Sequence, residues 1–288
     1  MAEKLRKLLA AYLPEPSKIA IYRTLYYLQI IRLNVIPVKY HSENEVVYHC
    51  CVQRTASQWL KNILSDPAIY QYSGLCFFNA RMLGVEKQPK SIAHPHNSIV
   101  SPLYIDYGFF QKQYKPQNYA VFFVGRDPRD IVISHYFASR YSHTLMGDML
   151  QRRKTLNKIS VEEGIIYTID YLRKFGLFNS LRSWYKAAQK NHRVLYVKYE
   201  KLVGAYQEEQ FSVVLKHCDI GMPQDILREL LSKHQFERIS GHQRGTQDVR
   251  SHYRKGTPGD WQNYFTPQIR AKFKDSTRDL IDLLGYNW

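Results

Sequence analysis

Short apolar runs alternate with stretches of helical periodicity along most of this chain. Four runs have the length and composition of buried strands, at residues 46–52, 98–104, 119–125 and 193–198. Helical patterns lie between and after them, at residues 58–64, 160–173, 177–189, 207–218, 223–233 and 266–284. This alternation predicts an α/β fold in which a central parallel β-sheet is flanked by helices.

The first 40 residues have a different pattern from the rest. We expect residues 1–40 to form an N-terminal helical segment and residues 41–288 to form a single domain. The apolar stretch at residues 18–32 is interrupted by Arg23 and Gln29, so it is shorter than the roughly 20 apolar residues that span a membrane. Two interpretations remain: a helix packed on the domain, or an interfacial helix attached to a membrane through its tyrosines and Lys4, Arg6 and Lys7.

Composition narrows the class of protein. A chain of 288 residues that is 44% hydrophobic can bury one large core. Its net charge of +16 indicates an anionic partner, such as an acidic acceptor, an anionic membrane surface or a polyanion, although a solvated basic face explains it equally well. The four cysteines show no C-x-x-C spacing, which favours a reducing cytoplasmic location, with membrane-peripheral attachment as a variant, and argues against a metal site.

The segment from Val121 to Ser134 carries the strongest local signal. An apolar run ends at Arg126, and Asp127 and Pro128 follow as the N-cap and first residue of a helix. A helix N-terminus attracts anions through its amide groups and dipole, and an arginine guanidinium matches phosphate oxygens. Ser134, in the same helix, is expected to face the same side. This junction predicts an anion-binding site.

Two other segments indicate the same chemistry. The loop at residues 53–57 is rich in small and hydroxyl residues and carries Arg54 between a strand and a helix, where backbone N–H groups can meet a phosphate or sulfate. Near the C-terminus, Arg254 and Lys255 precede Gly256 and a Pro-Gly turn, which makes a flexible basic loop. The pattern G-x-x-x-x-G-K-[ST] is absent from the first segment, which argues against a nucleotide kinase.

In this order, the three segments resemble the sulfotransferases that use 3′-phosphoadenosine 5′-phosphosulfate (PAPS). The family's Pro-Lys-Ser-Gly-Thr-Thr-Trp segment corresponds to residues 53–59, its arginine and serine to Arg126 and Ser134, and its Arg-Lys-Gly-x-x-Gly-Asp-Trp loop to residues 254–261. The resemblance implies a P-loop NTPase-like sulfotransferase fold. It also implies transfer of a sulfuryl group from PAPS to an acceptor hydroxyl or amine, by in-line displacement with a general base and release of adenosine 3′,5′-bisphosphate (PAP).

The resemblance also implies which residues bind the donor, with no metal ion. The first loop would hold the 5′-phosphosulfate, Arg126 and Ser134 the 3′-phosphate, and aromatic rings the adenine. Arg54 would in addition act catalytically on the leaving phosphate. Because an alanine replaces the family's glycine at residue 56, we expect a negative φ there. The full set of donor-binding candidates is Arg54, Thr55, Ala56, Ser57, Gln58, Trp59, Arg126, Ser134, Tyr199, Phe236, Arg254, Lys255 and Gly256.

The general base is the least determined part of the site. In the cytosolic branch of the family it is a histidine at the end of a strand, but residues 97–107 contain no histidine. The candidates are His94 and His96 just before that strand, Asp106 after it, because other branches use a carboxylate, and His135 beside Ser134. His143 lies in residues 139–159, which we expect to be a mobile lid over the acceptor pocket or a solvated loop.

Two alternative functions remain at this point. The substitutions in the first loop suit a relative that binds the cofactor but is inactive, and the charge suits a polyanion-binding or nucleic-acid-binding protein, although no nucleic-acid recognition motif occurs. For a sulfotransferase we expect a small-molecule, carbohydrate or lipid-like acceptor and no nucleic acid partner. The family's dimerisation motif keeps only Thr266, so that dimer is not expected.

Overall fold

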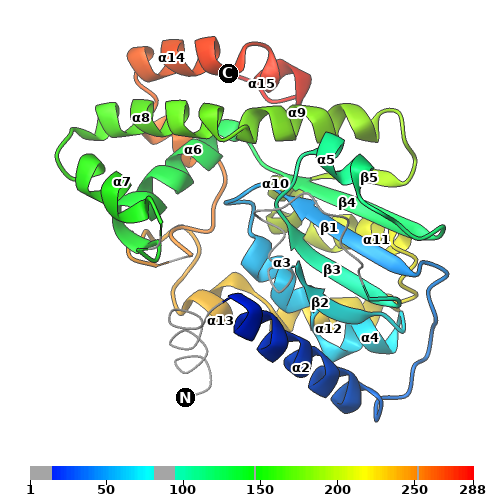
Figure 1. The fold of residues 1–288 in the computed structure, drawn as a ribbon. Helices are drawn as coiled ribbons and strands as arrows, with labels where there is room; N and C mark the ends of the chain where they lie inside the picture. Colours follow the sequence, from blue (N-terminus) through cyan, green and yellow to red (C-terminus); the bar gives the residue numbers. More distant parts are fainter. Residues whose placement is uncertain (1–14, 81–94, 146, 252) are drawn as a thin grey trace.

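The computed structural model describes residues 15–80, 95–145, 147–251 and 253–288. A parallel sheet of five strands, in the order β2-β3-β1-β4-β5, forms its centre (Figure 1). The predicted parallel α/β fold is therefore confirmed. The strands are β1 (Val46–Cys51), β2 (Cys76–Asn79), β3 (Ser98–Leu103), β4 (Tyr119–Gly125) and β5 (Val194–Lys198). The edge strand β2 was not predicted, because its four residues are too short a run to stand out.

Helices cover both faces of the sheet (Figure 1). The N-terminal helix α2 (Glu15–Leu33) packs beside β2. The first half of the domain contains α3 (Ser57–Leu64), α4 (Pro67–Gln71), α5 (Tyr107–Lys112), α6 (Pro128–Phe137), the π-helix η2 (Ala138–Ser142) and α7 (Met149–Leu156). The second half contains α8 (Val161–Lys174), α9 (Leu177–Ala188), α10 (Tyr199–Val203), α11 (Gln207–His217), α12 (Gln224–Lys233), α13 (Phe236–Ser240), the 3-10 helix η3 (Asp260–Asn263), α14 (Pro267–Thr277) and α15 (Leu280–Leu283).

The two faces of the sheet bury separate cores because successive strand residues point to opposite sides. Val47 and Phe122 pack with α3, α4, α11 and α12, whereas Tyr48 and Phe123 pack with α6, α8, α9 and α14. Trp184 of α9 lies fully buried against Phe123, with ring centroids 5.1 Å apart. The central strands are covered on both sides, which explains why they read as continuous apolar runs rather than alternating ones.

Two predicted segments differ from the structure. Residues 139–159, expected as a lid or a loop, contain most of η2 and all of α7, and Arg152 and Leu156 of α7 are buried. Residues 266–284 form two helices rather than one, because Arg278 adopts φ 57° and ends α14. The helix predicted from residue 160 is α8, and Ser160 and Glu163 form a capping box at its start.

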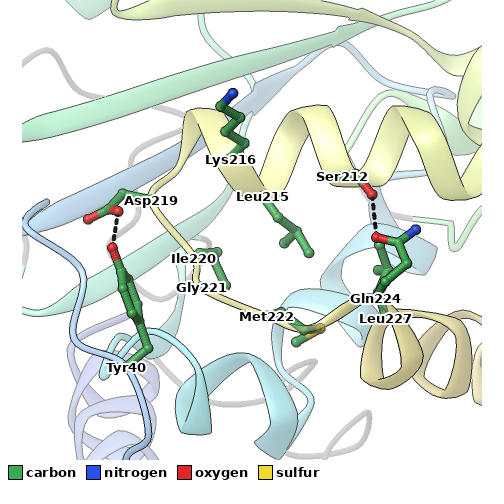
Figure 2. A pocket seen from close by; sticks show the side chains of 10 residues that line it. All are labelled: Tyr40, Ser212, Leu215, Lys216, Asp219, Ile220, Gly221, Met222, Gln224 and Leu227. Atoms are coloured by element: carbon green, nitrogen blue, oxygen red, sulfur yellow. Dashed lines mark hydrogen bonds between the residues drawn. The ribbon is translucent and has the colours of Figure 1, made fainter.

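A pocket of about 270 Å³ lies between α11 and α12 and is lined by Leu215, Met222 and Leu227, with Tyr40 hydrogen-bonded to Asp219 at one side (Figure 2). It sits near the amino ends of the strands, because His217 at the end of α11 contacts the carbonyls of Val121 and Arg193. Ligands of open α/β sheets bind at the carboxyl ends of the strands, so this pocket is separate from the site described next.

Candidate functional site

The turn from β4 to α6 follows the sequence prediction closely. Asp127 caps the helix by accepting a hydrogen bond from the backbone N–H of Arg129 over 2.9 Å, and Pro128 occupies the first turn. The Arg129 guanidinium also pairs with the Asp127 carboxylate at 2.7 Å and lies 3.8 Å from the Trp261 ring centroid. These contacts fix the turn so that Arg126 leaves the end of the strand at a defined position.

The loop between β1 and α3 adopts an unusual backbone. Arg54 has φ 71° and Ala56 has φ 58°, both in the left-handed region. The expectation of a negative φ at Ala56 was therefore wrong: the loop keeps the conformation that glycine would supply, at a cost of roughly 1–2 kcal/mol for a residue with a Cβ. The buried Thr55 hydroxyl donates to the Val52 carbonyl over 2.8 Å, so it braces the loop from inside.

Arg54 and Arg126 meet at the carboxyl edge of the sheet. Arg54 Nε donates to Ser134 Oγ over 3.0 Å, and Arg126 Nη1 donates to the Arg54 carbonyl over 3.2 Å. Arg126 lies 4.6 Å from the ring centroid of Tyr199, the first residue of α10. The loop after β1, the turn after β4 and the start of α10 therefore lie together at this edge.

The C-terminal basic loop is anchored by two buried carboxylates. Asp260 pairs with Arg254 and with Lys255, the latter at 2.6 Å. Asp130 of α6 accepts the backbone N–H groups of Gly259 at 2.7 Å and Trp261 at 3.0 Å, and it lies 3.4 Å from Arg126 Nη2. Sequence reasoning missed Asp130; the signal was an acidic residue directly before the apolar run Ile131–Ile133, which predicts a buried polar role.

Arg54 lies close enough to Arg126 and Arg254 for their charges to act on it. Burial, followed by repulsion from Arg126 and Arg254, lowers the pKa of Arg54 to about 10. Burial also acts to lower the pKa of Arg126, but Asp130 and other nearby groups outweigh it, so that pKa is raised. Arg126 Nε and Arg254 Nη1 are buried and find no acceptor among the described residues. Buried donors without acceptors are costly, so this arrangement is suited to an anionic ligand.

A sulfotransferase domain model matches residues 28–285, nearly the whole chain. The chain belongs to the sulfotransferase family. Two curated relatives are a flavonol sulfotransferase-like protein of Flaveria bidentis, 21% identical over 266 residues, and a flavonol 4′-sulfotransferase of Flaveria chlorifolia, 22% identical over 270 residues. These alignments cover 81% and 83% of this chain and 80% of each relative.

Two solved structures with bound PAP share the fold. A mouse sulfotransferase, SULT7A1, complexed with PAP superposes with a TM-score of 0.58 at 15% identity, over 84% of this chain and 86% of that one. A retinol dehydratase in complex with androsterone and PAP superposes with a TM-score of 0.51 at 13% identity, over 85% of this chain and 82% of that one. At these identities the likeness establishes the fold of this sulfotransferase.

The residues of this sulfotransferase fit a donor with two phosphate groups. Arg54, Arg126 and Arg254 bring three guanidinium groups near one another, and Arg126 Nε and Arg254 Nη1, which find no acceptor in the described part of the chain, are available for phosphate oxygens. Within the described residues, no cluster of three or more His, Cys, Asp or Glu side chains has the spacing of a metal site.

The aromatic candidates sit around the same loop. Trp59 is buried, donates from Nε1 to the His234 carbonyl over 2.7 Å and packs edge-on against Phe211. Phe236 is half-buried at the start of α13 and lies against Gly256, where an added Cβ would come within 2.7 Å of its ring. Trp59 therefore ties α3 to the segment that carries Phe236. Gln58 is half-buried in the first turn of α3.

The general-base candidates lie at different places in the fold rather than together beside the arginines. His96 is exposed at the amino end of β3, where it contacts Glu45 at 3.0 Å, so it lies at the opposite end of the strand from the arginines. Asp106 is exposed and caps α5 through the Phe109 N–H at 2.8 Å. His94 lies outside the described residues.

His135 is the one described histidine candidate that contacts the first loop. Its Nε2 lies 3.1 Å from Gln53 Oε1 and its Nδ1 lies 3.2 Å from Ser139 Oγ. Burial, and then the nearby cations including Arg54 and Arg152, hold its pKa well below the usual value. A neutral ring with both nitrogens engaged suits a bracing role. His143 lies 5.8 Å from it, ring centroid to centroid.

Sequence reasoning missed Tyr104, which follows the last residue of β3. Its hydroxyl lies 2.7 Å from Ser57 Oγ at the start of α3, and the side chain is half-buried beside Trp59's core cluster. It is also close enough to Arg54 to act on the pKa of that guanidinium. The signal was its position, because a histidine was expected at the end of this strand and the residue there is a tyrosine.

Proposed function

We propose that this protein transfers a sulfuryl group from PAPS to a hydroxyl group of a small-molecule acceptor. The acceptor oxygen forms a bond to sulfur as the bond between sulfur and the bridging phosphate oxygen breaks. The acceptor proton passes to a base, and PAP departs with the electron pair of the broken bond. The family assignment supports the class of reaction.

One observation carries the proposal: three buried or half-buried arginines converge at a sheet edge with two N–H groups that have no acceptor among the residues that the structure describes. A site that worked by acid catalysis would need carboxylates or histidines here to donate a proton. Asp130 and Asp260 are instead already engaged by the basic loop. The balance of charge favours a ligand with several negative charges, which a phosphosulfate provides.

In this proposal, each group of site residues binds a different part of the donor or the acceptor. Arg126 and Ser134 bind the 3′-phosphate, and Arg254, Lys255 and the amide of Gly256 close over it. Arg54 and the loop amides of Thr55, Ala56, Ser57 and Gln58 hold the 5′-phosphosulfate and stabilise charge that builds up on the leaving phosphate. Trp59, Phe236 and Tyr199 surround the adenine. Tyr104 replaces His96 and Asp106 as the side chain that meets the acceptor hydroxyl.

The acceptor class is proposed from the relatives and the charge. The curated relatives are named for flavonols, and one solved relative holds androsterone, so we propose a phenol or an alcohol on a hydrophobic small molecule. All four cysteines are buried thiols, Cys50, Cys51, Cys76 and Cys218, which supports a reducing compartment such as the cytoplasm.

A thermal-shift titration tests the proposal. PAP is expected to raise the melting temperature strongly, and 5′-AMP and ADP are expected to raise it far less, because only PAP carries the 3′-phosphate. An equal shift with ADP would contradict the assignment. A shift with polyanions that disappears with added salt would favour the polyanion-binding alternative. A shift with PAP but no labelled product from [³⁵S]PAPS and a panel of phenols would indicate an inactive relative.

A further inference from the structure

The helix α2 turns a row of large apolar side chains toward solvent. Its inner face packs on the domain: Tyr26 and Leu33 are buried, Tyr26 lies edge-on to Phe78 at 5.1 Å, and Gln29 Nε2 donates to the Phe77 carbonyl over 3.2 Å. Successive residues of an α-helix turn by about 100°, so residues two positions away point to the opposite side. The outer face, with its exposed fractions, comprises Leu25 (36%), Tyr27 (63%), Leu28 (48%) and Ile31 (63%), with Ile21 (38%) before it and Val35 (83%) just after the helix.

This face, which we call the α2 apolar face, requires an explanation. An isolated exposed apolar residue is ordinary, whereas several adjacent ones indicate an interaction surface. Figure 1 shows α2 along the outside of the sheet beside β2, with its outer side away from the domain. No helix of the described residues is long and apolar enough to cross a membrane. Several adjacent exposed apolar side chains favour a partner that covers the α2 apolar face from outside.

Charge distinguishes a lipid surface from a second copy of the chain. Residues 1–40 contain seven basic residues against two acidic ones; the basic residues are Lys4, Arg6, Lys7, Lys18, Arg23, Arg32 and Lys39, and the acidic ones are Glu3 and Glu15. In the described part of this segment Arg32 is exposed, and a symmetric partner would bring the same positive charges to the contact, where the two sets would repel each other. An anionic leaflet attracts them, at about 1 kcal/mol for each cation near the surface.

We infer that α2 is an interfacial helix that attaches this protein to anionic membranes. Tyr27, Leu28 and Ile31 enter the boundary between headgroups and acyl chains, and Arg32 contacts the lipid phosphates. Tyrosine suits this depth because its ring is apolar and its hydroxyl can stay in the headgroup layer. The inference concerns a surface, so it holds independently of the reaction at the arginine site.

Vesicle co-sedimentation with the full chain tests the inference. The probes are vesicles of phosphatidylcholine alone and vesicles with about 30% phosphatidylserine. We expect binding to the anionic vesicles at least about tenfold stronger than to the neutral ones, reduced by added salt. The double substitution Leu28→Glu and Ile31→Glu should reduce binding by about tenfold or more, since it places two carboxylates on the α2 apolar face.

Val213→Glu supplies the matched control, because Val213 is 44% exposed on α11, a different helix. This variant should bind vesicles like the unchanged protein. Unchanged melting temperatures of all variants would show that they fold. Absence of vesicle binding, or equal binding by the Leu28→Glu, Ile31→Glu variant, would overturn the inference. So would a concentration-dependent dimer in light scattering that the same double substitution abolishes, because a second copy would then cover the face.

Discussion

Arg54 Nε donates a hydrogen bond to Ser134 Oγ over 3.0 Å and joins two segments that lie 80 residues apart in the sequence. The bond orients the arginine of the first loop toward the helix that follows β4. Both side chains are candidate ligands of the donor, so the bond prepares the site before any anion arrives. A prepared site loses less side-chain entropy on binding, which increases affinity.

Ser134→Ala should weaken PAP binding by about tenfold, corresponding to about 1.4 kcal/mol, because one hydroxyl and one preset guanidinium are lost. Isothermal titration calorimetry measures the change directly. Ser65→Ala, at an exposed serine that bonds only its own helix, is the control and should leave the affinity unchanged. Equal affinity of the unchanged protein and Ser134→Ala would remove Ser134 from the site.

Asp130 is expected to hold the basic loop closed. It is 1% exposed and accepts two backbone N–H groups from the loop while it faces Arg126. Asp130→Asn removes the charge without changing the shape, and leaves Arg126 without its carboxylate. We expect a loss of about 3 kcal/mol in the free energy of unfolding and weaker PAP binding. Asp225→Asn, at an exposed acid in α12, should change the unfolding free energy by less than about 0.5 kcal/mol in the same urea titrations.

Local patterns predicted most of the fold and the two arginine turns, because they depend on residues close in sequence. The buried apolar runs gave four of the strands, and the Asp127-Pro128 pair marked the start of α6. What the sequence left undetermined depends on distant contacts. The roles of Asp130 and Tyr104 appear only when the basic loop and α3 are folded against them, at separations of 129 and 47 residues. The left-handed Ala56 was mispredicted because local steric preference yielded to the geometry of the loop.

Tyr104 is expected to act on the acceptor rather than on the donor. Tyr104→Phe removes only the hydroxyl that lies 2.7 Å from Ser57 Oγ. We expect the turnover of 4-nitrophenol with [³⁵S]PAPS to fall by about a hundredfold, within the range of lost proton-transfer groups, while the affinity for PAP changes by less than about twofold. Tyr206→Phe, at a tyrosine that is 67% exposed, controls for loss of a phenol hydroxyl. A parallel loss of PAP affinity would assign Tyr104 to the donor instead.

We expect that only glycine fits at residue 256 of the basic loop, because the Phe236 ring packs against it. Its φ is +71°, and an added Cβ would lie 2.7 Å from the Phe236 ring. Gly241→Ala is a matched control, because Gly241 has φ +76° but nothing within 4 Å of an added Cβ. In both variants an alanine takes a positive φ, which costs about 1 kcal/mol. A loss of PAP affinity in Gly256→Ala beyond that in Gly241→Ala therefore reports the contact with Phe236. Equal affinities of the two variants would show that the loop moves freely away from that ring.

Acid stability provides a test of the buried histidines. His49 is fully buried on β1 with Nδ1 2.7 Å from Ser101 Oγ, and burial lowers its pKa from 6.5 to about 3. The folded protein therefore keeps His49 neutral at pH 5, whereas the unfolded chain binds a proton there. Because the unfolded state takes up more protons as the pH falls, stability is present above pH 6.5 and is lost progressively below it.

For His49 alone, the loss between pH 6.5 and pH 5 should be about 2 kcal/mol, and His135, whose pKa is also lowered, should add to it. Urea unfolding at pH 7.5, 6.5 and 5.0 measures the slope. His49→Gln is expected to be less stable at pH 7.5, because it disturbs a packed ring stacked on Phe122, yet to lose less stability on acidification. His96→Gln removes an exposed imidazole and should keep the slope of the unchanged protein. A slope in His49→Gln as steep as that of the unchanged protein would mean that His49 does not stay neutral in the folded state at pH 5.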